Sequence, residues 1–122
     1  MRGLEHREQV ALMRWWSMAC RSFGVDESLL FAIPNGGNRD AVTGAMLKAE
    51  GVRAGVPDLF LAVPRNGFAG LFVELKKPKG GRVSRSQTDM LAALSASGYK
   101  TAVCHGWEGA MACIAGYLQG LR

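Results

Sequence analysis

Two neighbouring stretches decide the fold: residues 58–63 read DLFLAV, and residues 70–76 read GLFVELK. Branched and aromatic residues of this kind favour β-strands, and the Asn66-Gly67 pair between them favours a turn. Aliphatic side chains occupy alternate positions in both stretches, so they should share one buried face of a hairpin. These aliphatic residues are Leu59, Leu61, Val63, Leu71, Val73 and Leu75.

The remaining positions must share the other face, and they carry Asp58, Glu74 and Lys76 beside aromatic and small residues. A hairpin centred near Gly67 places Asp58 opposite Lys76 and diagonal to Glu74. Diagonal neighbours on paired strands lie roughly 7–8 Å apart. We therefore predict that two carboxylates and an ammonium group meet on one face of the hairpin.

Two carboxylates held together repel each other unless a cation lies between them, and Mg²⁺ binds through one or two carboxylates while keeping several waters. A bound metal activates water and stabilises charge on phosphate, and a neighbouring lysine can assist the water. Such a cluster favours phosphodiester hydrolysis. On geometry alone, a solvated strand face with a cross-strand ion pair between Asp58 and Lys76 is an equal alternative.

The segments around the hairpin predict an α/β domain with a mixed sheet. Residues 4–23 form an amphipathic pattern that ends at Gly24 and has Leu12, Trp16, Ala19 and Phe23 on one stripe. Further helices are expected at 39–50, 84–97 and 108–121, and further strands at 29–34 and 100–104. The predicted order is α-β-α-β-β-α-β-α over one domain, residues 1–122.

The composition favours a folded chain with a polyanionic partner. The 122 residues include 48% hydrophobic and 20% charged residues, and the net charge of +5 with a pI near 9.5 suits nucleic acid. The three cysteines have neither zinc nor disulfide spacing, so free thiols in a reducing compartment are expected. There is no signal-peptide pattern and no long apolar stretch, so we expect a cytoplasmic protein without a membrane span.

Three short motifs carry a resemblance to a known family. Residues 52–59 (VRAGVPDL), 72–76 (FVELK) and 84–87 (SRSQ) resemble the VRR-NUC branch of the PD-(D/E)XK nucleases, over most of the chain. Many members of that branch are small stand-alone phage and bacterial proteins, and others are domains of larger DNA-repair proteins. The resemblance implies a restriction-endonuclease-like mixed sheet flanked by helices, and a DNA nuclease that depends on Mg²⁺ or Mn²⁺.

The resemblance also implies roles for individual residues. Asp58, Glu74 and the carbonyl of Leu75 would bind the metal, and Lys76 would be the catalytic lysine. An acidic residue on the first helix completes such sites, and Glu5 and Glu8 both qualify. We favour Glu5, because it extends the core-facing stripe, where a carboxylate needs a partner. Stabilisation of the helix dipole is the alternative role for Glu5.

Other polar residues allow two interpretations each. Gln87 lies where the family places a glutamine near the active site, but Ser84-x-x-Gln87 is also a capping box. The basic residues Lys77, Lys79, Arg82 and Arg85 suit phosphate contacts or a solvated loop. The polar residues Asn35, Asn38 and Arg39 suit DNA contacts or a plain turn.

The expected activity is therefore cleavage of DNA by a metal-dependent nuclease. Stand-alone VRR-NUC proteins of this size resemble homodimeric structure-selective endonucleases, so we expect a homodimer acting on branched DNA such as four-way junctions. Two alternatives remain. One is a non-catalytic nucleic-acid-binding module that uses the same basic loop, and the other is a nuclease that acts on RNA.

Overall fold

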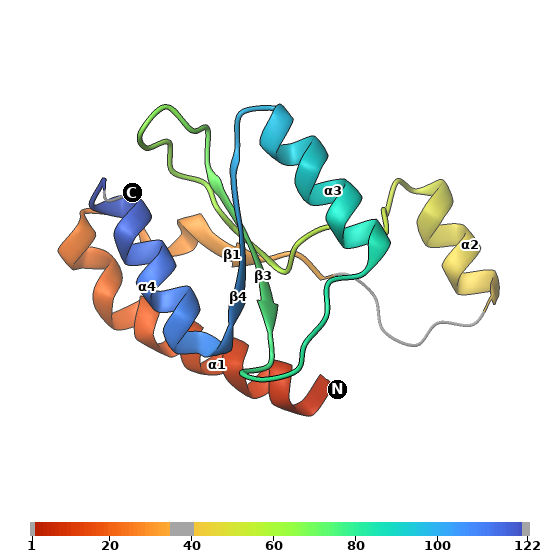
Figure 1. The fold of residues 1–122 in the computed structure, drawn as a ribbon, viewed down its shortest axis with the longest axis horizontal. Helices are drawn as coiled ribbons and strands as arrows, with labels where there is room; N and C mark the ends of the chain where they lie inside the picture. Colours follow the sequence, from red (N-terminus) through yellow and green to blue (C-terminus); the bar gives the residue numbers. More distant parts are fainter. Residues whose placement is uncertain (1, 35–40, 121–122) are drawn as a thin grey trace.

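The computed structural model describes residues 2–34 and 41–120, and their elements follow the predicted order. Figure 1 shows a sheet with α1 and α4 on one side, α3 on the other, and α2 standing apart. The helices are α1 (Arg2–Ala19), α2 (Ala41–Ala49), α3 (Arg85–Ala96) and α4 (Gly106–Leu118), with 3₁₀ turns at Cys20–Phe23 and Glu27–Leu29. The strands are β1 (Leu30–Ala32), β2 (Leu59–Leu61), β3 (Leu71–Lys76) and β4 (Lys100–His105). The prediction of an α/β fold with a mixed sheet flanked by helices is confirmed.

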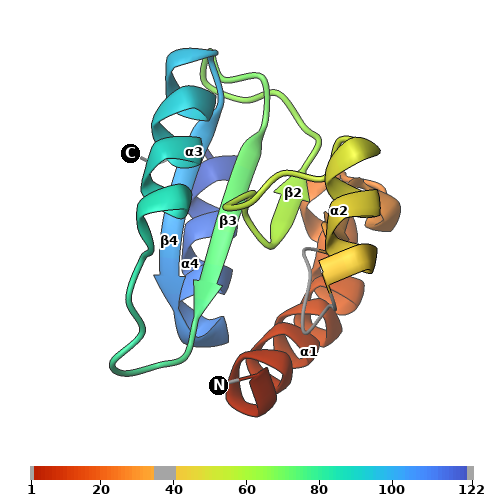
Figure 2. The ribbon, with the colours of Figure 1, turned by 90° about the vertical axis from the view of Figure 1, so that its right-hand side faces the viewer.

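The four strands lie in the order β1-β2-β3-β4. The pairs β1–β2 and β2–β3 are antiparallel, whereas β3 and β4 are parallel and are connected through α3. Parallel neighbours need such a crossover, because the chain must return to the end of the sheet at which β3 began before β4 can start. Figure 2 shows α3 lying along β4 on one face of the sheet and α4 behind the other.

The hydrophobic core lies between the sheet and the pair α1–α4. Leu12 and Trp16 of α1 are fully buried, Phe23 packs against the core and Ala19 is half-buried, which agrees with the predicted apolar stripe. From α4, Ala110 and Ile114 reach the same core. The alternating aliphatic residues of the hairpin are all buried here, which confirms the predicted face: Leu59, Leu61, Val63, Leu71, Val73 and Leu75.

The register of the hairpin differs from the prediction by two residues. Leu59 pairs with Val73 rather than with Leu75, so Asp58, just before β2, lies level with Glu74 instead of Lys76. The turn is the two-residue Asn66-Gly67 type with both φ angles positive, and residues 62–64 of the first arm lie opposite 69–70 of the second. The first arm therefore has one residue more than the second, and this extra residue shifts the register of the two strands. A shift by two preserves the two faces of a strand, so the charged side chains stay together.

None of the helices in the described ranges is long and apolar enough to cross a membrane. All three cysteines are free: Cys20 and Cys104 are buried, and Cys113 is half-buried. The predicted turn at residues 35–38 and the start of the predicted helix at 39–50 lie outside the described residues.

Candidate active site

The predicted site residues gather where β3 ends. In both ribbon views the amino-terminal turns of α1 lie close to the end of β3. Asp58 immediately precedes β2, Glu74 and Lys76 lie on β3, and Gln87 lies in the first turn of α3. Segments that are distant in sequence therefore supply one group of polar side chains at the end of the central strand.

Asp58 is fixed by the backbone of β3. Its Oδ2 atom accepts a hydrogen bond of 2.7 Å from the backbone N–H of Leu75. Its own carbonyl accepts a hydrogen bond of 2.8 Å from the N–H of Ile33, which continues the pairing of β1 with β2. The carboxylate is thereby held beside Glu74 before any ligand binds.

Gly55, in the motif before Asp58, permits a close approach of two backbones. It has a φ of +83°, and a Cβ atom there would lie 2.3 Å from the carbonyl oxygen of Ser86, in the first turn of α3. A side chain is excluded by both the conformation and the contact. In the sequence, Gly55 is recognisable only as part of the motif at residues 52–59. Its position three residues before the carboxylate was the available signal for a tight turn.

Gln87 forms the predicted capping box and also contacts two other predicted site residues, Glu74 and Lys76. Its Nε2 atom donates to Glu74 Oε2 at 2.9 Å, and its Oε1 atom accepts from Lys76 Nζ at 3.0 Å. The same Oε1 accepts from the N–H of Ser84 at 2.9 Å, while Ser84 Oγ accepts from the N–H of Gln87 at 3.2 Å. This reciprocal pair is a capping box. The amide therefore ties the start of α3 to the charged groups of β3.

Lys76 is almost enclosed, with 8% of its surface exposed. Its ammonium lies 3.3 Å from Glu74 Oε2, and its aliphatic stem packs against Gly81, where a Cβ would come within 2.8 Å of Lys76 Cβ. Burial of an ammonium is costly unless it is paired. The contacts with Glu74 and Gln87 supply that pairing. The ion pair of Lys76 is thus with Glu74, and not with Asp58 as in the alternative interpretation of the strand face.

Both carboxyl groups hold their protons more tightly than ordinary ones. Burial, and then the charge of Asp58, raise the pKa of Glu74 to about 7, although Lys76 opposes the shift. Burial also raises the pKa of Asp58, and the hydrogen bond from Leu75 opposes it. Lys76 offsets these effects only in part, and the charge of Asp58 still disfavours the ionised form of Glu74. A second positive charge nearby would favour that form.

The donor set fits a magnesium ion. Glu74 Oε1 is buried and has no hydrogen-bond partner in the described part of the chain, while the other oxygen of this carboxylate is fully used. Within residues 2–34 and 41–120, no group of three or more His, Cys, Asp or Glu side chains is placed to hold a metal. Mg²⁺ does not need one, because it binds through one or two carboxylates and retains waters. Asp58 and Glu74 therefore suit this ion.

The structure separates the two acidic residues of α1. Glu8 Oε1 accepts a hydrogen bond of 2.8 Å from the N–H of Trp107, so Glu8 caps the start of α4. Its partner is thus a backbone amide that lies 99 residues away in the sequence. Glu5 is half-buried, and after burial its charge contributes to the raised pKa of both Asp58 and Glu74. Glu5 thus acts on both carboxyl groups through its charge. In the described residues it does not complete a three-carboxylate metal group with Asp58 and Glu74, and its role as a metal ligand stays a prediction.

The basic residues lie next to this group. Lys79 and Arg82 are exposed on the loop between β3 and α3, Lys77 is half-buried there, and Arg85 begins α3. Arg85 forms an exposed ion pair with Asp89 at 3.4 Å. These cations therefore lie on and beside the loop that connects Lys76 with the start of α3. Asn35, Asn38 and Arg39 lie outside the described residues.

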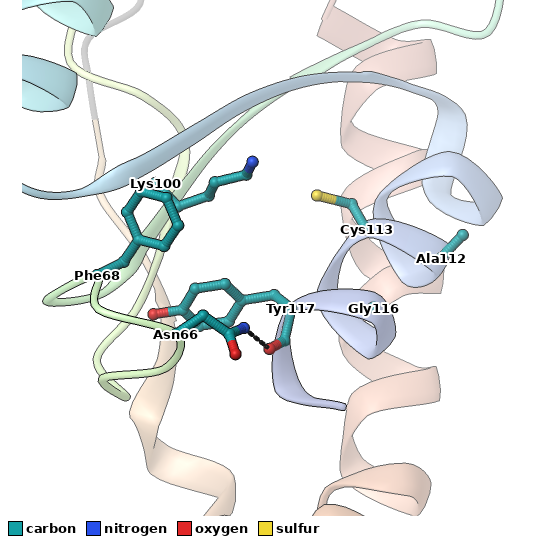
Figure 3. A pocket seen from close by; sticks show the side chains of 7 residues that line it. All are labelled: Asn66, Phe68, Lys100, Ala112, Cys113, Gly116 and Tyr117. Atoms are coloured by element: carbon teal, nitrogen blue, oxygen red, sulfur yellow. Dashed lines mark hydrogen bonds between the residues drawn. The ribbon is translucent and has the colours of Figure 1, made fainter. Parts of the chain in front are cut away.

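A separate cavity of about 580 Å³ lies at the opposite end of β3, beside the hairpin turn. Figure 3 shows that Lys100 and Cys113 both border it and that the Asn66 amide donates to the carbonyl of Tyr117, at 3.2 Å. No carboxylate lines it, so its chemistry differs from that of the Asp58–Glu74 pair. Its lining residues are Asn66, Phe68, Lys100, Ala112, Cys113, Gly116 and Tyr117.

Comparison with known proteins identifies the class to which this fold and site belong. The model of the VRR-NUC domain family matches residues 4–108, so the chain belongs to the VRR-NUC family, which is a family of nuclease domains. A solved structure described as a VRR_NUC domain protein superposes with a TM-score of 0.81 at 24% identity, covering 95% of this chain and 88% of the other. None of the curated proteins matches. The family prediction is confirmed, and the solved structure supports the fold.

Proposed function

We propose that this chain is a DNA nuclease that hydrolyses phosphodiester bonds with a bound Mg²⁺ or Mn²⁺. One observation carries the proposal: in the described part of the chain Glu74 Oε1 is buried and unpartnered, and burial with the charge of Asp58 raises the pKa of this carboxyl group to about 7. A purely structural ion pair would not need the second carboxylate. Membership of a family of nuclease domains supports the same conclusion.

Asp58, Glu74 and the carbonyl of Leu75 would hold the ion, which when bound supplies an activated water and offsets charge on a phosphate oxygen. The chain's own residues prepare the rest. The ammonium of Lys76 has three donor hydrogens, and its bonds to Gln87 and Glu74 leave one for the attacking water or for the phosphate. Gln87 holds both Lys76 and Glu74 through its amide, so these side chains need little reorganisation when the substrate binds.

The proposed substrate is branched DNA, such as a four-way junction, cut by a homodimer. The net charge of +5 and the exposed cations beside the site, among them Lys79 and Arg82, favour a polyanion. Phosphate contacts of this kind position a strand without specifying a sequence. Resemblance to stand-alone VRR-NUC proteins favours the dimer. Light scattering on the purified protein measures its oligomeric state directly.

A cleavage assay tests the proposal. Purified protein would be incubated with Mg²⁺ or Mn²⁺ and labelled single-stranded, duplex, flap and four-way DNAs, with RNA counterparts in parallel. We expect cleavage of DNA, fastest on branched forms. Cleavage of RNA alone would replace the proposed substrate. A non-catalytic binding module would leave all strands intact and bind them without any divalent metal.

Two substitutions test whether the activity depends on the carboxylate pair. Asp58→Asn and Glu74→Gln should each abolish cleavage and weaken Mn²⁺ binding in calorimetry, with the fold retained by circular dichroism. The matched control is Glu108→Gln, an exposed carboxylate in the first turn of α4. Unchanged Mn²⁺ affinity in both site variants would exclude this site as the metal centre.

A further inference from the structure

A row of aromatic rings crosses the sheet on the face that carries the carboxylates. Phe31 of β1 pairs with Phe60 of β2, which pairs with Phe72 of β3. The ring centroids of Phe31 and Phe60 are 5.8 Å apart, and those of Phe60 and Phe72 are 4.3 Å apart and stacked. Tyr99 contacts the last two rings edge-on. These rings form one continuous platform from the sheet edge to its centre.

The outer end of this row is open to solvent. Phe31 is 43% exposed on the edge strand, whereas Phe60 and Phe72 are half-buried. Phe60 is also fixed against the backbone, because a Cβ on Gly70 would lie 2.7 Å from its ring. Phe31 is therefore the ring that a ligand can reach.

Two rings of the row, Phe60 and Phe72, lie two residues along their strands from the carboxylates of Asp58 and Glu74. Phe72 precedes Glu74 by two residues on β3, and Phe60 follows Asp58 by two at β2, so all four side chains point to one face. Side chains at this spacing are about 7 Å apart along a strand. A base is separated from its own phosphate by a distance of the same order. A strand with a phosphate at the carboxylates therefore has a neighbouring base within reach of the row.

We infer that the row ending at Phe31 is a stacking site for an unpaired base next to the phosphodiester bond that is cut. This inference rests on the proposed nuclease function and narrows its substrate to strands with an unpaired nucleotide at the cut. Stacking on an aromatic ring needs a free base face, which a paired and stacked base in a duplex does not offer. Flaps and single-stranded gaps provide such a base.

Binding without divalent metal tests this inference separately from catalysis. In EDTA, the probes would be a single-stranded oligonucleotide with one 2-aminopurine and the same sequence as a duplex. We expect Phe31→Ala to weaken single-strand binding about tenfold or more, which corresponds to the loss of one stacking contact between a base and an aromatic ring. Duplex affinity should change by less than about twofold, because no base face is free there.

Two further variants interpret the result. Phe31→Trp should restore single-strand affinity and the quenching of 2-aminopurine, because every aromatic ring offers a face for stacking. Met18→Ala, at a side chain that is 79% exposed on α1, is the matched control and should bind like the parent chain. Equal affinities of Phe31→Ala and the parent for the single strand, or equal losses on both probes, would overturn the inference. Failure of the parent to cleave any strand with Mg²⁺ would instead overturn the nuclease proposal.

Discussion

Gln87 Nε2 donates a hydrogen bond to Glu74 Oε2 at 2.9 Å, so the residue that caps α3 also touches the carboxylate pair. The cap of α3 and the carboxylate pair are thus coupled through one amide. Secondary structure and site geometry depend on the same side chain. Suitable variants can separate the two contributions.

Gln87→Ala and Ser84→Ala both remove half of the capping box, but only the first breaks the contacts with Glu74 and Lys76. Each should cost about 1 kcal/mol of unfolding free energy. Only Gln87→Ala should also lower the single-turnover cleavage rate, by about tenfold or more, because general positioning of charged groups is lost. Thermal denaturation and rate measurements on both variants check this. Equal rate losses would mean that the cap alone matters.

Glu5→Gln should lower the cleavage rate about tenfold or more, whereas Glu8→Gln should retain most activity. The charge of Glu5 acts at Asp58 and Glu74, where it would add to the attraction for a bound cation, while Glu8 is engaged by the N–H of Trp107. Glu8→Gln should instead lower the melting temperature slightly, because the start of α4 loses a charged acceptor. Parallel rates and melting curves distinguish the two. An inactive Glu8→Gln beside an active Glu5→Gln would reverse the assignment.

The metal-free protein should lose stability as the pH rises towards neutrality. Burial raises the pKa of Glu74 to about 7, whereas an unfolded glutamate titrates near about 4.3. Between these values the folded chain binds a proton that the unfolded chain has released, so the free energy of unfolding falls with pH. The loss is complete above the folded pKa. Asp58, whose pKa is also raised, acts in the same direction.

Glu74→Gln removes this titration and should flatten the dependence. In EDTA, its stability relative to the parent should improve by an amount on the order of 2 kcal/mol between about pH 4 and pH 8. Urea denaturation at both pH values measures the difference, with Glu108→Gln as the control. Parallel curves for the parent and Glu74→Gln would show that burial of Glu74 carries no such penalty.

Gly55→Ala should be strongly damaging, because its Cβ would lie 2.3 Å from the carbonyl oxygen of Ser86 at a φ of +83°. We expect lower stability and a cleavage rate reduced by more than about tenfold, since the backbone carrying Asp58 must move away from α3. Gly44→Ala is the matched control, because its Cβ meets nothing within 4 Å and it lies inside helix α2. Helix propensity should make that variant neutral or slightly stabilising. Similar melting temperatures for the two would contradict the steric argument.

Periodicity was sufficient for the elements and for the two faces of the hairpin. Alternation with period two assigned Leu59 and Val73 to the core whatever the register. The register itself depended on the turn and on an extra residue in one arm, and neither leaves a signal in the alternation. The partner of Glu8 was equally out of reach, because it is a backbone N–H that is 99 residues away. Sequence patterns describe local geometry well, and contacts between distant segments poorly.

The polar group at the end of β3 draws on α1, on the residue before β2, on β3 and on α3, and this has a consequence for biosynthesis. A nascent chain cannot form these contacts until the first turn of α3 has left the ribosome, and Glu8 finds its partner only after Trp107 has emerged. Closure of such long loops must precede the contacts that they make possible. Translation therefore delays assembly of the Asp58–Glu74 pair until most of the chain has been synthesised.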